Sequence, residues 1–275
     1  MLGSYLYDSI YFNSHDLYSL NSKKAKRIDF LQPQDVLKEI DEIKPDVIIN
    51  CVAITSFDFC EKFSKKADQI NAVTPGVISE FCYKMGIYFI HISTDHYYSG
   101  AKNYAHNETD SINILNNYAK TKFDAENYVL TNPDALVLRT SIVGRNKKKS
   151  SFLDWLIYSI NNNKKISLFD DAYSSFIHCE EFSKLIASIL LESKPSGLFN
   201  LASKDVFSKA DFAIALANQL KLEINYSFAS VDTLNVNRAN SCGLDSRRIS
   251  SLLGLNLPSM MDTVLVSADE FMKKL

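Results

Sequence analysis

The stretch Ile87-Tyr88-Phe89-Ile90-His91-Ile92 is followed without a break by Ser93-Thr94-Asp95. A near-continuous apolar run of this length predicts a strand whose two faces are both buried, as in parallel sheets. Open α/β sheets bind their ligands just beyond the carboxyl ends of such strands. Residues 87–95 therefore predict the fold class, and they put polar side chains where a functional site is expected.

Further apolar runs flank this strand, and helical patterns separate them. We expect strands at 9–13, 45–50 and 135–139, and helices at 34–43, 61–71, 75–85 and from 118 onward. Buried strands that alternate with helices are typical of a sheet with helices on both faces. The sequence thus predicts an α/β protein with a Rossmann-like, doubly wound parallel sheet.

The spacing of these patterns loosens after Gly144. We expect further helices near 151–162, 179–192, 208–220, 245–253 and 259–274, and strands at 166–169, 197–201 and 224–229. This predicts a Rossmann-like domain over residues 1–145 and a smaller, mixed α/β lobe over residues 146–275. The strands near 166–169 and 197–201 are candidates to return to the main sheet.

Composition narrows the class of protein. Of 275 residues, 46% are apolar and 23% are charged, and the net charge of −2 gives no general attraction for nucleic acid. The five cysteines are odd in number and lack Cys-x-x-Cys spacing, so neither a disulfide framework nor a zinc site is indicated. No apolar run reaches the roughly 18 residues of a membrane span. With no signal peptide either, a cytoplasmic protein without a membrane partner is expected.

Tyr118 and Lys122 lie four residues apart in a segment without Gly or Pro until Pro133. On a helix, positions i and i+4 share a face, so the phenol and the ammonium can enter one pocket. A phenol has a pKa near ~10 in water, and a nearby cation favours its ionised form. That brings the phenol closer to acid–base work at neutral pH. With the Thr94 hydroxyl at the preceding strand end, the pattern indicates reduction of a carbonyl group.

The same spacing also has less specific explanations. A second Tyr-x-x-x-Lys pair, Tyr98 and Lys102, brackets the turn signal Ser99-Gly100, so its side chains would not share a helical face. The Tyr118 pair by itself is also compatible with an ordinary amphipathic helix that carries a surface lysine. Other motifs of the chain are needed to distinguish these interpretations.

Taken together, the motifs resemble those of the extended short-chain dehydrogenase/reductases, and among them the dTDP-4-dehydrorhamnose reductase family. The family's Asn-x-x-Ala-x-Thr appears as Asn50-Cys51-Val52-Ala53-Ile54-Thr55, and its Ser-Thr-Asp-Tyr-Val-Phe-x-Gly as residues 93–100. Its Tyr-Gly-x-x-Lys-x-x-x-Glu appears at 118–126, and its Arg-Thr-Ser-Trp-Val-x-Gly is close to the six residues 139–144. Arg238 and Leu244-Asp245 match an Arg-Pro…Leu-Asp motif of the substrate lobe. The matches run in order from Gly3 to Gly254.

The resemblance implies NAD(P)H-dependent reduction of a nucleotide-linked 4-keto sugar in the synthesis of cell-surface polysaccharide precursors. Tyr118 would protonate the carbonyl oxygen, and Thr94 would hydrogen-bond the same oxygen. Lys122 would lower the pKa of the phenol and hold the nicotinamide ribose. The cofactor is NADP(H) or NAD(H), no metal is implied, and a homodimer is compatible with the resemblance.

The resemblance also implies two sets of binding residues. The cofactor-binding set comprises Gly3, Asp29, Phe30, Ala53, Ile54, Asn71, Tyr118 and Lys122. The substrate-binding set comprises Thr94, Asp95, His96 and Arg238. Asp29 has an alternative role as a turn or helix-cap residue. Arg238 suits a diphosphate oxygen, because its planar fork binds such groups bidentately, and its alternative is a surface or interdomain salt bridge.

Four residues depart from the family's pattern near the sugar-nucleotide side. His96 replaces a tyrosine, Ile142 a tryptophan, Ala239 a proline and Cys242 a serine. The Tyr118, Lys122 and Thr94 set is unaffected. The chemistry is therefore expected to be that of the family, while the identity of the sugar stays open.

The N-terminal segment departs further. A dinucleotide-binding domain opens with a strand and a glycine-rich turn, whereas this chain begins Met1-Leu2-Gly3-Ser4-Tyr5-Leu6, as if at the last glycine of that turn. The chain as given is therefore expected to bind the dinucleotide weakly. A truncated or misassigned start and a catalytically silent binding or regulatory protein both account for this. A sugar-nucleotide epimerase or dehydratase of the same superfamily is the alternative enzyme.

Overall fold

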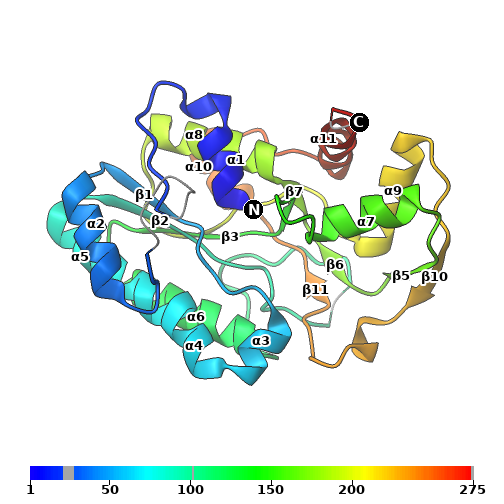
Figure 1. The fold of residues 1–275 in the computed structure, drawn as a ribbon, viewed down its shortest axis with the longest axis horizontal. Coiled ribbons are helices and arrows are strands. Elements are labelled where there is room, and N and C mark those ends of the chain that lie inside the picture. The colour runs from blue at the N-terminus through cyan, green and yellow to red at the C-terminus, as the bar shows by residue number, and fades with distance from the viewer. Residues whose placement is uncertain (21–27, 101, 274–275) are drawn as a thin grey trace.

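Four parallel strands form the central sheet of the computed structural model, which describes residues 1–20, 28–100 and 102–273. In spatial order they are β1 (Val47–Asn50), β2 (Tyr88–Ile92), β3 (Leu136–Arg139) and β8 (Gly197–Asn200). Ile90 of β2 is in register with Ile49 on one side and Leu136 on the other. Because every pairing is parallel, all four carboxyl ends lie along one edge of the sheet (Figure 1).

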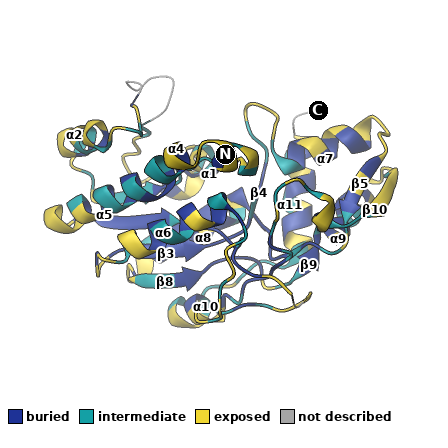
Figure 2. Ribbon diagram, turned by 90° about the horizontal axis from the view of Figure 1, so that it is seen from below, coloured by how far each residue is buried: buried dark blue, intermediate teal, exposed yellow. Residues whose placement is uncertain are grey.

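Side chains of the strands alternate between two apolar layers, one on each face of the sheet. Tyr88 and Ile90 belong to one layer, whereas Phe89 belongs to the other. The first layer contains residues of α1 (Leu2–Asp8), α8 (Cys179–Glu192) and α10 (Arg247–Leu253). The second contains residues of α2 (Pro33–Ile43), α5 (Thr74–Met85) and α6 (Asn117–Val129). The strands are accordingly buried between helices (Figure 2), and the predicted doubly wound α/β sheet is confirmed.

The N-terminal segment differs from its prediction. Residues 9–13, expected as a strand, form a helix cap followed by a 3-10 turn over Ile10–Phe12. The Ser9 side chain accepts a hydrogen bond from Tyr11 N, which caps the turn, and Ile10 is 72% exposed. Only Phe12 enters the core, against the α8 layer. The strand prediction was wrong because backbone groups of this short apolar run are hydrogen-bonded within its own turn. The run therefore needs no neighbouring strand.

The helix predicted at 61–71 is divided into three pieces. They are α3 (Phe57–Lys62), α4 (Ser64–Asp68) and a π turn over Gln69–Val73 that runs into α5. The π turn carries Asn71, which is fully buried. Its amide holds the backbone of Ile54, accepting from Ile54 N at 2.7 Å and donating to Ile54 O at 3.0 Å. The wide turn, a feature common at functional sites, thus fixes the segment that follows β1.

Beyond β3 the chain builds a second lobe, at the right of Figure 1. Its helices are α7 (Phe152–Asn161), α9 (Lys209–Leu220) and α11 (Met260–Met272). Its short strands pair as β5 (Ile166–Phe169) with β10 (Tyr226–Ala229), and as β6 (Tyr173–Ser174) with both β9 (Phe207–Ser208) and β11 (Ser241–Cys242). A further pair joins β4 (Ile142–Val143) to β7 (Ile177–His178), and a 3-10 turn covers Val231–Thr233. Of the two strands considered for the main sheet, residues 197–200 join it as β8, whereas residues 166–169 pair with β10.

A buried ion pair joins α6 to β3. The Arg139 guanidinium donates to both carboxylate oxygens of Glu126 at 2.7–3.2 Å. The Ser93 hydroxyl donates to the same carboxylate at 2.5 Å, and Arg139 also donates to the Tyr98 hydroxyl at 2.8 Å. A buried pair of this kind is tolerated only while each charge keeps its partner and its hydrogen bonds. It therefore holds the carboxyl ends of β2 and β3 against α6.

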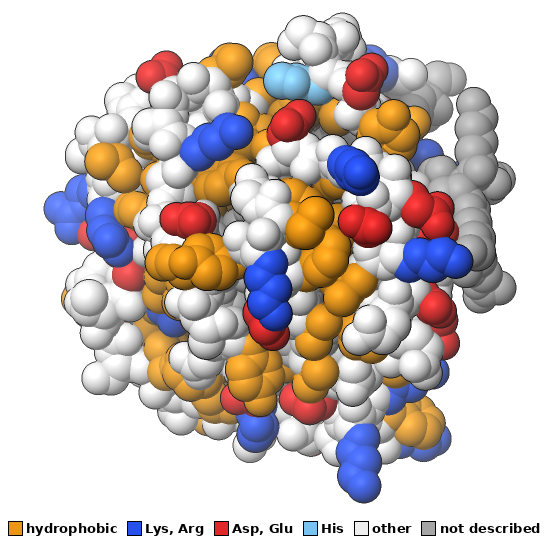
Figure 3. Space-filling model, turned by 90° about the vertical axis from the view of Figure 1, so that its left-hand side faces the viewer, with side chains coloured by type: hydrophobic (Ala, Val, Ile, Leu, Met, Phe, Trp, Pro, Cys, Tyr) orange, Lys and Arg blue, Asp and Glu red, His pale blue; other side chains and the backbone are white. Residues whose placement is uncertain are grey.

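The outer surface mixes side chains of all kinds on the face shown in Figure 3, where acidic and basic groups are interspersed with hydrophobic ones. This face carries no field of a single sign that would attract a polyanion. No helix in the described part of the chain is both long and apolar enough to cross a membrane.

The ion pair gives a prediction for stability. Glu126→Ala leaves the Arg139 charge buried without its partner, so the free energy of unfolding should fall by about 3–5 kcal/mol. Urea denaturation followed by circular dichroism measures the loss. The double variant Glu126→Leu/Arg139→Met should recover much of it, because no charge then stays buried. Equal losses in the single and double variants would contradict this account.

Candidate active site

Tyr118 lies in the first turn of α6, next to the residues that follow β2. The helix begins there because the Asn116 side chain caps it, accepting from Ala119 N at 2.8 Å. Asn116 also donates to Asn237 O at 2.9 Å, which ties the start of the helix to the second lobe. Tyr118 is 8% exposed, and the Thr94 side chain is close enough to lower the pKa of its phenol. The predicted proton donor and its partner hydroxyl are therefore adjacent.

The phenol of Tyr118 is a neutral acid in this structure. Burial raises the pKa of Tyr118 to about 12, the hydrogen bond with Thr94 lowers it, and the charges of Asp95 and Cys60 raise it. The lowering expected from Lys122 is not among the causes that act on the phenol here. The neutral form is the one a general acid needs in order to donate its proton.

Lys122 is turned toward β2 rather than toward the phenol. Its side chain is 2% exposed, and Nζ lies 2.7 Å from Ile92 O and 3.0 Å from His91 Nε2. Burial lowers the pKa of Lys122 to about 8, against the raising effects of Glu126 and Cys51. The structure thus gathers the three predicted catalytic side chains at one edge of the sheet, with the ammonium held on its inner side.

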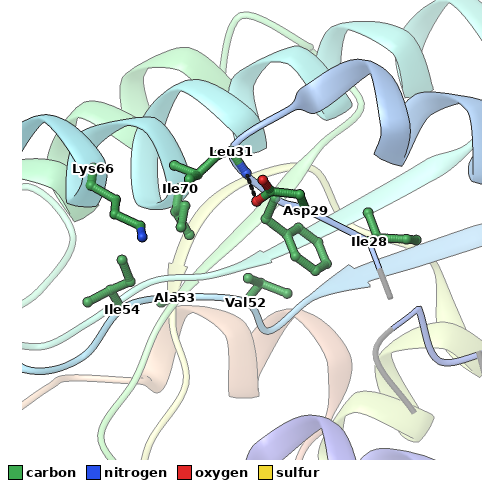
Figure 4. Close-up of a pocket in the computed structure, with 9 residues that line it drawn as sticks. Ile28, Asp29, Leu31, Val52, Ala53, Ile54, Lys66 and Ile70 are labelled. Atoms are coloured by element: carbon green, nitrogen blue, oxygen red, sulfur yellow. Dashed lines mark hydrogen bonds between the residues drawn. The ribbon is translucent and has the colours of Figure 1, made fainter. Parts of the chain in front are cut away.

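A cavity of about 630 Å³ opens at the same edge (Figure 4). Its lining comprises Ile28, Asp29, Phe30, Leu31, Val52, Ala53, Ile54, Lys66 and Ile70. Four of the residues predicted to bind a cofactor, Asp29, Phe30, Ala53 and Ile54, are among them. Ile54 also packs against the small apolar cluster of Cys60, Ala67 and Tyr118. The cavity and the predicted proton donor therefore share this cluster.

The remaining predicted cofactor residues lie around this cavity rather than in it. Asn71 is behind the wall, where it clamps the Ile54 backbone. Gly3 belongs to α1 and is outside the lining. Asp29 lines the cavity, and it also accepts from Leu31 N at 3.0 Å, as its alternative role in a turn predicts.

Arg238 approaches the phenol across the ring of Phe57. Its guanidinium lies 4.4 Å from the Phe57 centroid, and that ring contacts Tyr118 edge-on at 5.1 Å. Arg238 Nε is buried without a hydrogen-bond partner among the described residues. Burial lowers the pKa of Arg238, and Asp58 raises it. A buried N–H left unpaired beside the phenol is a donor open to a ligand.

Asp95 and His96, which were predicted to bind the substrate, lie close to Tyr118. The rings of His96 and Tyr118 are 6.1 Å apart, and His96 Nε2 lies 3.9 Å from Asp95 Oδ1. Asp95 is 4% exposed and accepts from the Ser174 hydroxyl at 2.6 Å. Burial lowers the pKa of His96, and its Nδ1 has no partner among the described residues. The imidazole is therefore neutral and keeps one ring nitrogen free.

Two cations act on this group from the second lobe. The charges of Lys209 and Arg238 lower the pKa of His96, and Asp95 raises it. Asp95, His96 and Cys242 offer ligand atoms within 4.8 Å of one another, as in a metal site. The neighbouring cations would repel a metal ion, however, and would attract an anionic group.

Phe57, Lys66, Ser174 and Lys209 were missed by sequence reasoning. Phe57 follows directly on the Asn50–Thr55 motif, and that proximity was the one available signal. Lys66 lies on α4 and lines the cavity. Its position depends on the division of the predicted 61–71 helix into separate pieces, which the sequence pattern did not indicate. Ser174 and Lys209 come from the second lobe, and no local pattern relates them to Asp95.

Comparison with known proteins identifies the family. The family model of the RmlD substrate binding domain matches residues 1–272. The chain belongs to this family. The resemblance inferred from the motifs is confirmed, and with it membership of the extended short-chain dehydrogenase/reductases.

Named relatives and a solved structure agree with this assignment. The chain is 27% identical to the "Probable low-salt glycan biosynthesis reductase Agl14" of Haloferax volcanii, over 86% of this chain and 81% of the relative. It is 27% identical to the dTDP-4-dehydrorhamnose reductase of Aggregatibacter actinomycetemcomitans, over 86% and 85%. The crystal structure of dTDP-4-dehydrorhamnose reductase from Bacillus anthracis in complex with NADP superposes with a TM-score of 0.88 at 22% identity, over 98% and 95% of the two chains. This last likeness shows that the fold is shared.

The cations around His96 give a prediction for its titration. Lys209→Met removes a charge that lowers the pKa of His96, so that pKa should rise and the protonated fraction at a given pH should increase. Histidine NMR signals followed across pH measure the shift, with His96→Gln for assignment. Asp95→Asn should move the pKa the opposite way. The exposed Lys204, replaced by Met, is the matched control and should leave the titration unchanged; an unchanged titration in Lys209→Met would place that ammonium outside the group.

Proposed function

We propose that this protein reduces the 4-keto group of a nucleotide-linked sugar, with a nicotinamide dinucleotide as the hydride donor. The observation that carries the proposal is the buried Tyr118 phenol beside Thr94, in an apolar cluster against which the cavity residue Ile54 packs. Relatives at 27% identity are named as a dTDP-4-dehydrorhamnose reductase and a glycan biosynthesis reductase. Their names support a role in making precursors of cell-surface polysaccharides.

The residues around the cavity fit a dinucleotide. Phe30, Ala53 and Ile54 supply apolar walls for a flat ring, while Asp29 and Lys66 supply an acceptor and a cation for polar groups. Lys122 is the residue that we assign to the nicotinamide ribose. When bound, reduced nicotinamide would supply the hydride. NADP(H) and NAD(H) both satisfy this chemistry.

Tyr118 then acts as the general acid. The phenol donates its proton to the carbonyl oxygen, and the Thr94 hydroxyl orients that oxygen by a hydrogen bond. Both side chains are more than nine-tenths buried, so little water competes for the developing charge. The high pKa of the free phenol keeps its proton in place until the acceptor arrives.

The second lobe supplies the charges for substrate recognition. Arg238 carries an unpaired buried N–H, and burial lowers the pKa of the nearby Lys209. Two such cations suit the diphosphate of a nucleotide sugar. We accordingly assign residues 1–145 to the cofactor and the chemistry, and residues 146–275 to the substrate.

The setting we propose is the cytoplasm. All five cysteines are free thiols, as a reducing compartment would keep them. Burial raises the pKa of the Cys51 thiol to about 12, so it stays unreactive. A homodimer is part of the proposal, and sedimentation of the purified protein tests it.

The phenol's role is tested by Tyr118→Phe. Oxidation of NADPH in the presence of a dTDP-linked 4-keto-6-deoxy sugar should slow by about 10²–10⁴-fold, because general acid catalysis is lost while the ring is retained. Circular dichroism should show an unchanged fold. Tyr128→Phe alters an exposed tyrosine on the same helix and serves as the control. Wild-type turnover in Tyr118→Phe would remove the phenol from the mechanism.

The cavity's role is tested by filling it. Ala53→Trp should weaken the binding of NADPH and of NADH by more than about tenfold, or about 1.4 kcal/mol, because the indole would occupy the space of the cofactor. Isothermal titration calorimetry measures both affinities. Ala215→Trp is the matched control, since Ala215 lines a separate cavity of about 340 Å³ between α9 and α11. Equal affinities in the wild type and Ala53→Trp would show that the dinucleotide binds elsewhere.

A further inference from the structure

His91 lies between the Asn50 amide nitrogen, which is a donor, and the Lys122 nitrogen, whose role depends on the tautomer of the ring. Its Nδ1 is 3.0 Å from the amide nitrogen of Asn50, and its Nε2 is 3.0 Å from Lys122 Nζ. His91 is fully buried, Asn50 is 7% exposed and Lys122 is 2% exposed. Water therefore has little access to these three side chains. Each of their hydrogen-bond donors must accordingly find its acceptor within the protein.

The orientation of Asn50 is fixed by the backbone. Val52 N donates to Asn50 Oδ1 at 3.1 Å, so the amide oxygen faces Val52 and the amide nitrogen faces His91. A neutral imidazole has one donor and one acceptor. With Nδ1 accepting from Asn50, the ring proton must be on Nε2, where it points at Lys122. An ammonium has three donors and no acceptor, whereas a neutral amine has a lone pair that can accept this proton.

The surroundings of Lys122 favour the amine independently. The nearby carboxylate of Glu126 is engaged by Arg139 and Ser93, and no described carboxylate forms an ion pair with Lys122. The Cys51 thiol is neutral because burial raises its pKa to about 12. Burial and the Lys122 charge lower the pKa of His91, so the ring is neutral too. Burial likewise lowers the pKa of Lys122 to about 8, so its amine form becomes accessible close to neutral pH.

We propose that Asn50 and His91 are positioning residues that fix an Nε2–H tautomer of His91 and thereby favour the neutral amine form of Lys122 in the protein without cofactor. The inference rests on the proposed function for its use. In that function, an amine close to balance with its ammonium form would gain its charge when a hydrogen-bond-accepting or anionic group of the cofactor binds beside it.

The tautomer is tested directly in the wild-type protein. Long-range ¹H–¹⁵N NMR of histidine-labelled protein separates protonated from unprotonated ring nitrogens, and His91→Gln assigns the signals. We expect Nε2 protonated and Nδ1 unprotonated across the neutral range. An Nδ1–H tautomer, or a doubly protonated ring, overturns the proposal.

The effect on Lys122 is tested by reversing the tautomer. Asn50→Asp replaces the donor facing Nδ1 with an acceptor, which moves the ring proton to Nδ1 and turns Nε2 into an acceptor for the ammonium. The titration of Lys122, followed by NMR of ¹³Cε-labelled lysine and assigned with Lys122→Met, should move up by roughly one to two pH units. An unmoved titration with a reversed tautomer would show that His91 does not control Lys122.

Asn132→Asp is the matched control. Asn132 is also buried, and its Oδ1 likewise accepts a backbone N–H two residues ahead, from Asp134 at 2.9 Å. It should leave the Lys122 titration in place, so an equal shift in this variant would attribute the effect to added negative charge and overturn the assignment. Neither measurement uses substrate or cofactor. If the reductase activity were absent, the tautomer and the titration would still decide this inference.

Discussion

Helix α6 carries three ionisable side chains into the interior on one face, and the surrounding structure is arranged to satisfy them. Tyr118, Lys122 and Glu126 follow one another at intervals of four residues, and none is more than 8% exposed. Each meets a polar group at the carboxyl edge of the sheet. The phenol meets Thr94, the lysine meets the carbonyl of Ile92, and the carboxylate meets Arg139. Without these partners the helix could not pack where it does, because a buried polar group left unpaired is costly.

Burial has different chemical consequences for these three side chains. Glu126 is fully compensated by Arg139 and Ser93, so its position is structural. Lys122 has no carboxylate left to it, so burial works against its charge. Tyr118 keeps its proton firmly while the site contains no ligand. A single helical face thus supplies a structural carboxylate, a lysine close to balance between its amine and ammonium forms, and an acid. Their order along α6 sets the distance of each from the cavity.

Much of this arrangement was predictable from the sequence. Apolar runs gave the strands of the sheet, and the four-residue spacing gave the shared face of α6, because both follow from local geometry. The prediction of a strand at 9–13 was wrong for a local reason as well, because capping by the Ser9 side chain competes with sheet pairing. The sequence predicts His91 only as part of a strand. The role that we propose for it depends on Asn50 and Lys122, which lie beside its two ring nitrogens only in the folded chain. Lys209 was beyond reach for the same reason.

The group around Asp95 shows how the surroundings of the phenol can differ from the family's pattern while the phenol itself is kept. His96 and Cys242 both depart from the family's pattern, and they meet at Asp95 although they come from different lobes. Lys209 acts electrostatically on the same group, so the site combines a buried carboxylate, a neutral imidazole and cations. Tyr118 contacts the rings of Phe57 and His96 at the border of this group. A replacement at position 96 or 242 therefore alters shape and charge beside the phenol, while Thr94 and the α6 face that carries Tyr118 are left unchanged.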